Sequence, residues 1–514
     1  MFTASETSII SLIVLAALAI LGWGFYRARP FGKVGILAWL QSVVLIAPWL
    51  LFFGLFTAGI YINIVGILFL IVASTGVYIL IGNRLRAAGQ DAVLRAYRGK
   101  PQAASHSISK TDSRTTESLP NSTQSENLTE ANTPKPQAPL NLDVMPIPDE
   151  DLSAMRSIFG IDTFFATETI PYQEGVIFKG NLRGEPEAVH ERLTTSLQER
   201  LGDRYRLFSV ENLDGKPVVI ILPSRNDPPT TTLPQKILAV LLLVTTIATS
   251  LETGGLLLGF DFFANPARFG EPLPIAAGIL AVLTAHEIGH RLLGRRHQVR
   301  LSLPFFLPTV QIGAFGAITR FESLVPNRKV LFDIATAGPA AGGIVSLLML
   351  LIGLLLSHPG SSFQVPSEFF QGSILVGTLS RVILGTAVQQ PLVDVHPLTV
   401  IGWLGLVITA LNLMPAGQLD GGRIVQAIYG RKTAGRTTVA TLVVLAIASL
   451  ANPLALYWAI VIVFLQRDLE RPSLNELTEP DDARAALGLL ALFLMITTLL
   501  PLTPSLAGRL GIGG

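Results

Sequence analysis

The sequence contains no cysteine. This absence excludes disulfide bonds, a thiol nucleophile and any thiolate metal site, so a bound metal ion would need His, Asp or Glu as its ligands. Charged residues are scarce as well: they make up 14% of the 514 residues, and the net charge is only +2. That balance lacks the strongly basic surface of nucleic-acid-binding proteins, so no nucleic-acid partner is expected.

Apolar residues take the place of the missing charges. They make up 50% of the chain, and the mean hydropathy of +0.52 excludes a soluble enzyme of ordinary composition. Several apolar runs approach the roughly 20 residues with which a helix crosses a bilayer. The sequence predicts an α-helical multi-pass membrane protein with about eight to ten transmembrane helices. Part of that range reflects residues 437–466, which suit either a short hairpin or one kinked helix.

These runs divide the chain into four predicted parts. They are a membrane anchor at residues 1–99, a disordered linker at 100–143, a soluble α+β domain at 144–228 and a second membrane domain at 229–514. The anchor contains three apolar spans, at residues 8–26, 35–56 and 61–82. No Lys or Arg precedes the first span, which favours an anchor over a secretion signal. Basic residues follow the first and third spans, so the positive-inside rule predicts that the soluble domain is cytoplasmic.

The soluble part shows the pattern of a small α+β fold. One predicted helix has an apolar residue at every fourth position: Val189, Leu193, Leu197 and Leu201. Two strands are predicted after it, at residues 204–210 and 217–222, joined by a turn. The segment from Gly180 to Gly184, Gly-Asn-Leu-Arg-Gly, is interpreted as a strand-to-helix turn. His190, His297, His358 and His396 are interpreted as surface or structural residues.

The motif His286-Glu287-Ile-Gly-His290 lies inside an apolar run that extends from residue 273 to 293. Residues four apart on an α-helix share one face, so both imidazoles can bind one metal ion while Glu287 lies beside it. Two neutral His ligands, an open position for water and a carboxylate to accept the proton form the site of a zinc hydrolase. Ionisable residues within a membrane helix normally mark a functional site, which favours this interpretation over a chance match.

Two segments that follow the motif are predicted to surround it. Residues 301–322 contain two prolines and two glycines, so they suit a re-entrant hairpin better than a spanning helix. The free edge of such a hairpin could pair with an extended substrate, although a purely structural loop is the alternative. Residues 330–357 form a further apolar span, in which small residues around Gly338 and Pro339 allow close approach to the motif helix.

A third segment supplies the remaining candidates. An apolar span at residues 398–414 leads to Asp420, and basic residues from Arg423 onward put this end on the same side as the motif. A tetrahedral catalytic zinc needs a third protein ligand, for which Asp420 is the candidate, although it would also suit a turn or a helix cap. Asn412 could donate a hydrogen bond to the oxyanion of a tetrahedral intermediate, or could satisfy backbone groups freed by Pro415.

Together, these motifs resemble those of the site-2 protease family of intramembrane zinc metalloproteases. The resemblance covers residues 235–466 and rests on three elements in order: His286-Glu287-Ile-Gly-His290, Gly338-Pro339, and Asn412-x-x-Pro415-x-x-x-Leu419-Asp420-Gly421. The segment Gly180-Asn181-Leu182-Arg183 further resembles the branch called ethylene-dependent gravitropism-deficient and yellow-green, found in photosynthetic membranes. In one departure, Gly342 stands where many members carry Asn.

The resemblance implies a Zn²⁺ ion held by His286, His290 and Asp420, with Glu287 as the general base. It also implies hydrolysis of peptide bonds within or beside the transmembrane segments of membrane-protein substrates, with the lipid bilayer as the surrounding partner. The active site is expected near the cytoplasmic or stromal face of a plasma or thylakoid membrane.

Two other functions remain open on the sequence. A catalytically silent membrane scaffold would keep the fold but would not need Glu287. A divalent metal transporter would also carry His and Asp in membrane helices, but its ligands would line a path across several spans. The candidates here cluster on one side.

Overall fold

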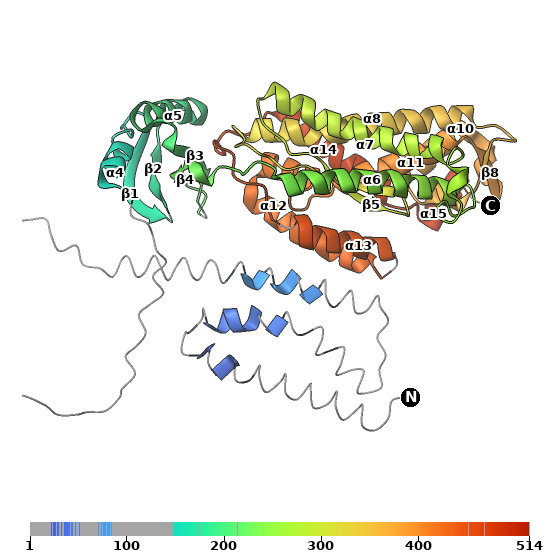
Figure 1. Ribbon diagram of the computed structural model, residues 1–514, viewed down its shortest axis with the longest axis horizontal. Helices are drawn as coiled ribbons and strands as arrows, with labels where there is room; N and C mark the ends of the chain where they lie inside the picture. Colours follow the sequence, from blue (N-terminus) through green and yellow to red (C-terminus); the bar gives the residue numbers. More distant parts are fainter. Residues whose placement is uncertain are drawn as a thin grey trace, which may run out of the picture. The chain divides into compact units, whose positions relative to one another are not determined.

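We describe a computed structural model of the chain, which describes residues 147–512 except 173, 213, 451 and 467, and scattered residues between 22 and 84 (Figure 1). The predicted linker and most of the three predicted N-terminal spans lie outside the described residues, so they stay predictions. Pro146–Gly514 form one compact unit, in which an α+β domain precedes a larger helical part.

The α+β domain is a four-stranded antiparallel sheet with two helices packed on one face. Its elements are α4 (Asp149–Arg156), β1 (Phe164–Tyr172), β2 (Gly175–Leu182), α5 (Pro186–Leu201), β3 (Tyr205–Glu211) and β4 (Pro217–Pro223), and the strand order is β1-β2-β4-β3. All four predicted apolar positions of α5 are buried in one core with Met155 and Phe178. Burial of these side chains is the main source of the domain's stability. The predictions of α5, β3 and β4 are confirmed.

Only the end of the Gly-Asn-Leu-Arg-Gly segment is the strand-to-helix turn that the sequence predicts: Arg183 and Gly184 lie between β2 and α5. Strand β2 continues through Leu182, and Gly180 and Asn181 pair with Ala166 and Phe165 of β1. A side chain at Gly180 would overlap the carbonyl oxygen of Phe165, so the close approach of the two strands requires glycine. The prediction failed because β1 was not expected, since a bulge after Ala166 interrupts its alternation of apolar and polar residues.

His190 is not the exposed surface residue that the sequence predicts. Its Nδ1 lies 2.9 Å from Ser209 Oγ of β3, and its Nε2 lies 3.5 Å from Thr194 Oγ1. Burial lowers the pKa of His190 to about 4, so the ring is neutral near pH 7. The prediction failed because the contact with Ser209 depends on how α5 packs against β3, 19 positions away, which the local pattern does not show.

The helical part contains four described helices that are long and apolar enough to cross a membrane: α6 (Leu233–Leu257), α7 (Leu273–Arg296), α8 (Arg328–Leu356) and α14 (Asp482–Leu499). The other helices are α9 (Glu368–Gln371), α10 (Ile374–Leu384), α11 (Pro397–Asn412), α12 (Asp420–Ala448), α13 (Pro453–Val461) and α15 (Pro504–Leu510). A small hairpin joins β7 (Phe363–Pro366) to β8 (Leu392–Val395). The chain is therefore a multi-pass helical membrane protein that also contains sheets.

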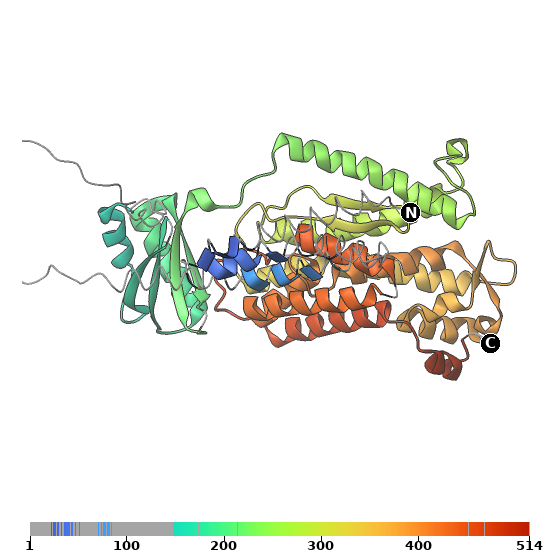
Figure 2. The ribbon, with the colours of Figure 1, turned by 90° about the horizontal axis from the view of Figure 1, so that it is seen from below.

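Helices α7, α8 and α11 pack against one another in the helical part (Figure 1). Figure 2 shows the same helices from below. Glycine allows their close contact. A side chain at Gly289 of α7 would overlap the carbonyl group of Ala337 in α8, and one at Gly402 of α11 would overlap the backbone of Leu350 in α8. Inside lipid, such close van der Waals packing takes over from the hydrophobic effect as the force between helices.

A hairpin follows α7, as the sequence predicts. Its strands are β5 (Phe305–Thr309) and β6 (Gly313–Ile318). Helix α6 packs against it: Thr249 Oγ1 donates to Gly313 O at 2.7 Å, and Thr253 Oγ1 donates to Val310 O at 3.0 Å. These bonds satisfy carbonyl groups that could not be left facing lipid.

Residues 437–466 form a hairpin of two helices rather than one kinked helix. The end of α12 supplies the first arm, and α13 with a π-helical turn at Ile462–Gln466 supplies the second. Asn452 begins the second arm, because its side-chain oxygen accepts a hydrogen bond of 3.0 Å from Leu454 N. Helix α12 has its own kink, at Gly430.

The α+β domain contacts the helical part through its edge strand β3. Ser209 N donates to Leu474 O at 2.8 Å, and Glu476 N donates to Ser209 O at 2.9 Å. The segment between α13 and α14 therefore pairs with β3 as an added strand. On its other side, Leu474 N donates to Val325 O at 2.9 Å, in the loop before α8. This segment holds the domain against the helices.

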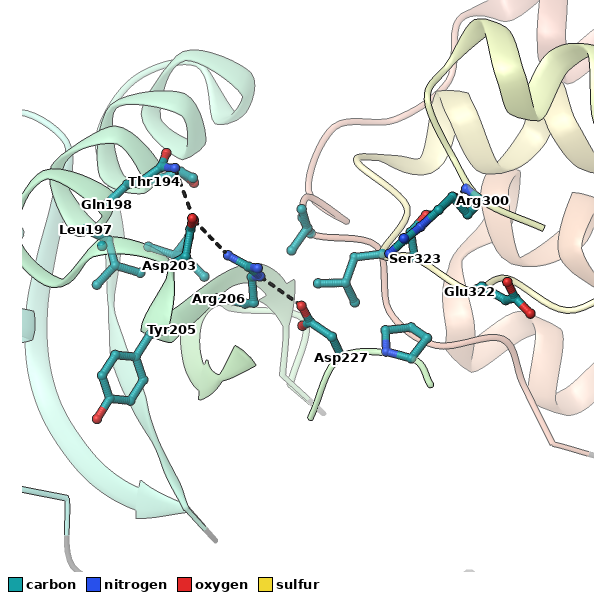
Figure 3. A pocket seen from close by; sticks show the side chains of 15 residues that line it. Thr194, Leu197, Gln198, Asp203, Tyr205, Arg206, Asp227, Arg300, Glu322 and Ser323 are labelled. Carbon is teal, nitrogen blue, oxygen red and sulfur yellow. Dashed lines mark hydrogen bonds and ion pairs between the residues drawn. The ribbon is translucent and has the colours of Figure 1, made fainter. Parts of the chain in front are cut away.

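A cavity of about 350 Å³ lies beside this contact, with walls from both parts (Figure 3). On the domain side, Arg206 forms ion pairs with Asp203 and Asp227, at 3.4 and 3.1 Å. On the helical side, Glu322 accepts a hydrogen bond of 2.8 Å from Thr231 N, just before α6. Both walls are thus fixed by polar contacts.

Candidate metal centre

Helix α7 brings its three motif residues to the interior of the helical part. His286, Glu287 and His290 are 6%, 6% and 4% exposed. The two imidazoles lie on one face, one helical turn apart, and their Nε2 atoms are 3.1 Å apart. Burying three ionisable groups is costly, so they require a partner from elsewhere in the chain.

That partner is Asp420, the first residue of α12, which is 6% exposed. Its Oδ2 lies 3.1 Å from His286 Nε2 and 3.3 Å from His290 Nε2. A side chain at Gly421 would overlap the carbonyl oxygen of Leu413, so the tight turn that aims Asp420 requires glycine next to it. The sequence predicts this proximity, but not that a helix begins at Asp420.

The spacing of the three ligand atoms fits a zinc ion. Zn–N and Zn–O bonds are about 2.0–2.1 Å long, so two ligands of a tetrahedral ion lie about 3.3 Å apart. The atoms from His286, His290 and Asp420 are separated by 3.1, 3.1 and 3.3 Å. Within the described ranges, no other group of three or more His, Asp or Glu residues is close enough to hold one ion.

Helix α8 orients the imidazole of His290 and packs closely against His286. His290 Nδ1 lies 2.8 Å from the carbonyl oxygen of Ile334, which favours the proton on Nδ1 and leaves Nε2 for a metal. A methyl group at Gly338 would overlap His290 Nε2, and a Cβ at Gly342 would lie 3.1 Å from His286 Cβ. The Gly-Pro element therefore makes room for the ligands, and Gly342 adds no polar contact of its own.

Glu287 lies toward the hairpin. Its Oε2 accepts a hydrogen bond of 2.8 Å from Thr319 Oγ1, in the segment just after β6. Glu287 and His286 line a recess too small for a water molecule, whose other walls come from α7, the hairpin and α11: Val282, Leu283, Phe306, Gly316, Ala317, Ile408 and Thr409. Glu287 thus has one oxygen fixed by hydrogen bonding and stands beside the ligand group, where a general base is needed.

Asn412 lies at the end of α11, next to β6. Its Nδ2 donates to Phe315 O at 3.0 Å and to Ile408 O at 2.8 Å. These two bonds use both hydrogens of the amide. In this arrangement Asn412 holds strand β6, and its role toward an oxyanion stays a prediction.

His297, His358 and His396 lie outside the ligand group, as predicted. His297 Nε2 is 3.4 Å from Asp333 Oδ2, and His358 is exposed. His396 caps α11, because its Nδ1 accepts a hydrogen bond of 3.3 Å from Leu398 N. Each of these histidines has a structural or surface role.

The sequence matches two family models. Peptidase family M50 matches residues 274–451, which contain all three candidate ligands, and the EGY3 middle domain matches residues 153–228 in the α+β domain. "Probable zinc metalloprotease EGY2, chloroplastic" from Arabidopsis thaliana is 39% identical over 378 residues, which are 71% of this chain and 67% of the relative. The chain belongs to peptidase family M50. The predicted site-2 protease family is therefore confirmed.

Two further relatives from the same plant carry related names. "Probable zinc metalloprotease EGY1, chloroplastic" is 38% identical over 393 residues, covering 69% of this chain and 72% of the relative. "Probable zinc metallopeptidase EGY3, chloroplastic" is 32% identical over 380 residues, covering 68% and 65%. No solved structure matches the chain. These relatives confirm the predicted branch of the M50 family. They also confirm that the enzyme is a zinc metalloprotease, with zinc as its cofactor.

Three buried residues beside the centre were not predicted. Thr319 carries no motif, and Glu470 lies in a connecting segment with no periodic pattern. Arg423 was interpreted as one of the basic residues at the membrane surface, but it is 5% exposed and pairs with Glu470 at 2.9 Å. Only the unusual position of an arginine three residues after a candidate ligand could have drawn attention to it.

Proposed function

We propose that this M50 protein is an intramembrane protease that hydrolyses peptide bonds in or next to the transmembrane segments of other membrane proteins. One observation carries the proposal: the ligand group is buried and lies in a helix long enough to span a membrane. His286 and His290 belong to α7, and Asp420 approaches them from α12. A substrate must therefore reach the site among membrane helices.

Each residue of the centre has a proposed role. His286, His290 and Asp420 would hold the zinc ion, and the ion, when bound, supplies Lewis-acid activation of a water molecule. Glu287 takes a proton from the attacking water and later passes it to the leaving amine. The hydrogen bond from Thr319 occupies one oxygen of Glu287 and leaves the other for this transfer.

The substrate must unwind before cleavage, because the amides of a transmembrane helix are hydrogen-bonded to each other. We propose that the unwound segment adds as a strand to the hairpin of β5 and β6. Gly316 and Ala317 of the hairpin lie beside Glu287 and His286, and this proximity supports the proposed strand addition. A strand paired there would pass the proposed base.

The site is proposed to lie near the cytoplasmic or stromal face. His290 lies six residues before Arg296, the last residue of α7, which corresponds to about 9 Å along the helix. Arg291 and Arg295 cluster with Arg296 at this end, and such clusters mark cytoplasmic helix ends. By the same positive-inside argument, we propose that the soluble domain at residues 144–228 lies on the cytoplasmic or stromal side.

The membrane itself is proposed to be photosynthetic. The relatives are named chloroplastic, which supports a thylakoid membrane, and a plasma membrane is the alternative. A transporter has less support, because the described residues contain a single ligand group rather than a series of them. A silent scaffold has less support because it would not need Glu287 beside that group.

Cleavage of a model transmembrane protein tests the proposal. Purified full-length protein in lipid vesicles is mixed with a single-span substrate that carries a label at each end, and mass spectrometry locates the cleaved bond. We expect cleavage within or beside the apolar span by the wild type. Glu287→Gln should lose cleavage and retain zinc, whereas His286→Ala should lose both.

The exposed glutamate of α9 offers a matched control. Glu368→Gln makes the same chemical change as Glu287→Gln far from the ligand group, and it should cleave like the wild type. Persistent cleavage by Glu287→Gln would contradict the proposed mechanism. Cleavage restricted to water-soluble peptides would contradict the proposed substrate class.

A further inference from the structure

Arg423 lies one helical turn after Asp420 and is 5% exposed. Its Nη1 is 3.8 Å from Asp420 Oδ1, whereas Oδ2 of the same carboxylate faces the two imidazoles. A buried cation needs a compensating charge. Glu470, which is 7% exposed, provides it, because Arg423 Nε donates to Glu470 Oε2 at 2.9 Å.

Arg423 also reaches the proposed base, through Thr319. Arg423 Nη2 donates to the carbonyl oxygen of Thr319 at 2.8 Å, and the Thr319 hydroxyl donates to Glu287 Oε2 at 2.8 Å. Thr319 is 6% exposed, so bulk water does not compete for these bonds. One guanidinium group therefore lies against Asp420 and is joined to Glu287 by a single residue.

A buried ion pair of this kind contributes little to stability, because desolvation of two charges offsets most of their attraction. Stability alone therefore does not explain why Arg423 and Glu470 are buried together. A guanidinium group is planar and donates in several fixed directions, whereas an ammonium group acts as a point charge. Arg423 uses this geometry to contact Glu470, Thr319 and Asp420 at once.

We propose that Thr319 and Arg423 are positioning residues for the hydrolysis, an inference that rests on the proposed function. Thr319 fixes the orientation of the Glu287 carboxylate. Arg423, held by Glu470, fixes both Thr319 and the oxygen of Asp420 that faces away from the imidazoles. A general base must stay within hydrogen-bonding reach of the proton it takes, and a ligand carboxylate needs its second oxygen held.

Two substitutions at Thr319 separate its hydroxyl from its carbonyl. Thr319→Val keeps the shape and the carbonyl but cannot donate to Glu287, whereas Thr319→Ser can. We expect Thr319→Val to lower kcat about 10- to 100-fold with KM changed less than about twofold, and Thr319→Ser to recover to within about threefold of wild type. Thr437→Val is the matched control, because that hydroxyl donates only to Ala434 within α12.

Substitution of Arg423 has a readout that does not require cleavage. Cobalt(II) can stand in for zinc, and its visible absorption reports coordination geometry. We expect Arg423→Gln to bind cobalt about 10- to 100-fold more weakly and with altered absorption, while Thr319→Val changes neither. The double variant Arg423→Gln/Glu470→Gln removes both buried charges, so it should fold like the wild type and still bind cobalt weakly.

These outcomes separate the inference from the proposed function. A normal kcat in Thr319→Val, alongside an inactive Glu287→Gln, would overturn the role of Thr319 and leave the proposed function standing. Wild-type cobalt affinity and absorption in the double variant would overturn the role of Arg423. A wild type that cleaves no membrane substrate would overturn the proposed function, and the cobalt measurement would still decide whether Arg423 positions Asp420.

Discussion

The carboxylate of Asp420 lies 3.1 Å from the imidazole of His286, across 134 positions of sequence. Both side chains are buried, and each is held by its own helix. The centre therefore depends on the contacts that set these helices relative to one another. Substitutions that change those contacts should alter metal binding even where they leave the ligands intact.

Gly338 of α8 is the first such position. An alanine there would overlap His290 Nε2, and His290 cannot move away because Ile334 O holds its other nitrogen. We expect Gly338→Ala to bind zinc at least about tenfold more weakly and to lose activity. Gly343→Ala is the control in the same helix, since its Cβ would meet only Thr409 Cγ2, at 3.5 Å. Equal zinc affinity in the two variants would contradict the prediction.

Asn412 separates two interpretations of its role. Both amide hydrogens hold carbonyl groups, one of them on β6. We expect Asn412→Ala to retain zinc and to raise KM about tenfold, because β6 loses its fixed position beside the substrate path. A loss confined to kcat would instead indicate a hydrogen bond to the oxyanion. Asn265→Ala, in an exposed loop, should leave both constants unchanged.

The α+β domain should lose stability as the pH falls below neutrality. Burial lowers the pKa of His190 to about 4, whereas an unfolded histidine titrates near pH 6.5. The unfolded state then binds the extra proton first, so stability is complete above about pH 6.5 and falls progressively toward pH 4, by up to about 3 kcal/mol. Urea titrations at several pH values, with proteolysis as the readout of unfolding, measure how the free energy of unfolding of this domain changes with pH.

Replacing His190 should remove this pH dependence. His190→Gln keeps a polar side chain near Ser209 but does not titrate, so we expect a flatter stability profile between pH 4 and 6.5. His358→Gln is the control, because His358 is exposed. An unchanged slope in His190→Gln would assign the acid sensitivity to other groups.

The added strand on β3 should govern how firmly the domain is held. Leu474 packs with Phe208, Val210 and Val218 on the outer face of the sheet. Leu474→Asp would bury a charge there, and we expect at least about tenfold faster limited proteolysis between the domain and α6. Ile161→Asp, at a site that is 79% exposed on the same domain, should leave the rate unchanged. Identical rates would mean that other contacts hold the domain.

The sequence predicted the elements whose cause is local. A short stretch of sequence was enough to predict three of them. They are α5, from its four-residue apolar period, α7, from its apolar run, and the hairpin, from its prolines and glycines. The spacing of His286 and His290 on one helix was sufficient to predict the shared site. Asp420 was predicted as the third ligand from the position of basic residues at helix ends and from the absence of cysteine.

Other features could not be predicted because they depend on distant partners. Gly180 lies in a strand because it pairs with the bulged strand β1, and His190 is partly buried because it contacts Ser209 of β3. Arg423 has the sequence context of a surface charge, yet Glu470 makes its burial possible. Contacts between residues that are far apart in the chain leave no periodic pattern in a single sequence.

The joint hold of His286, His290 and Asp420 on one ion can be measured directly as the zinc content of the purified full-length chain. We predict about one zinc ion per chain in the wild type and in Glu287→Gln, and less than about a tenth of that in Asp420→Ala after dialysis against a weak chelator. Wild-type zinc content in Asp420→Ala would contradict the shared site.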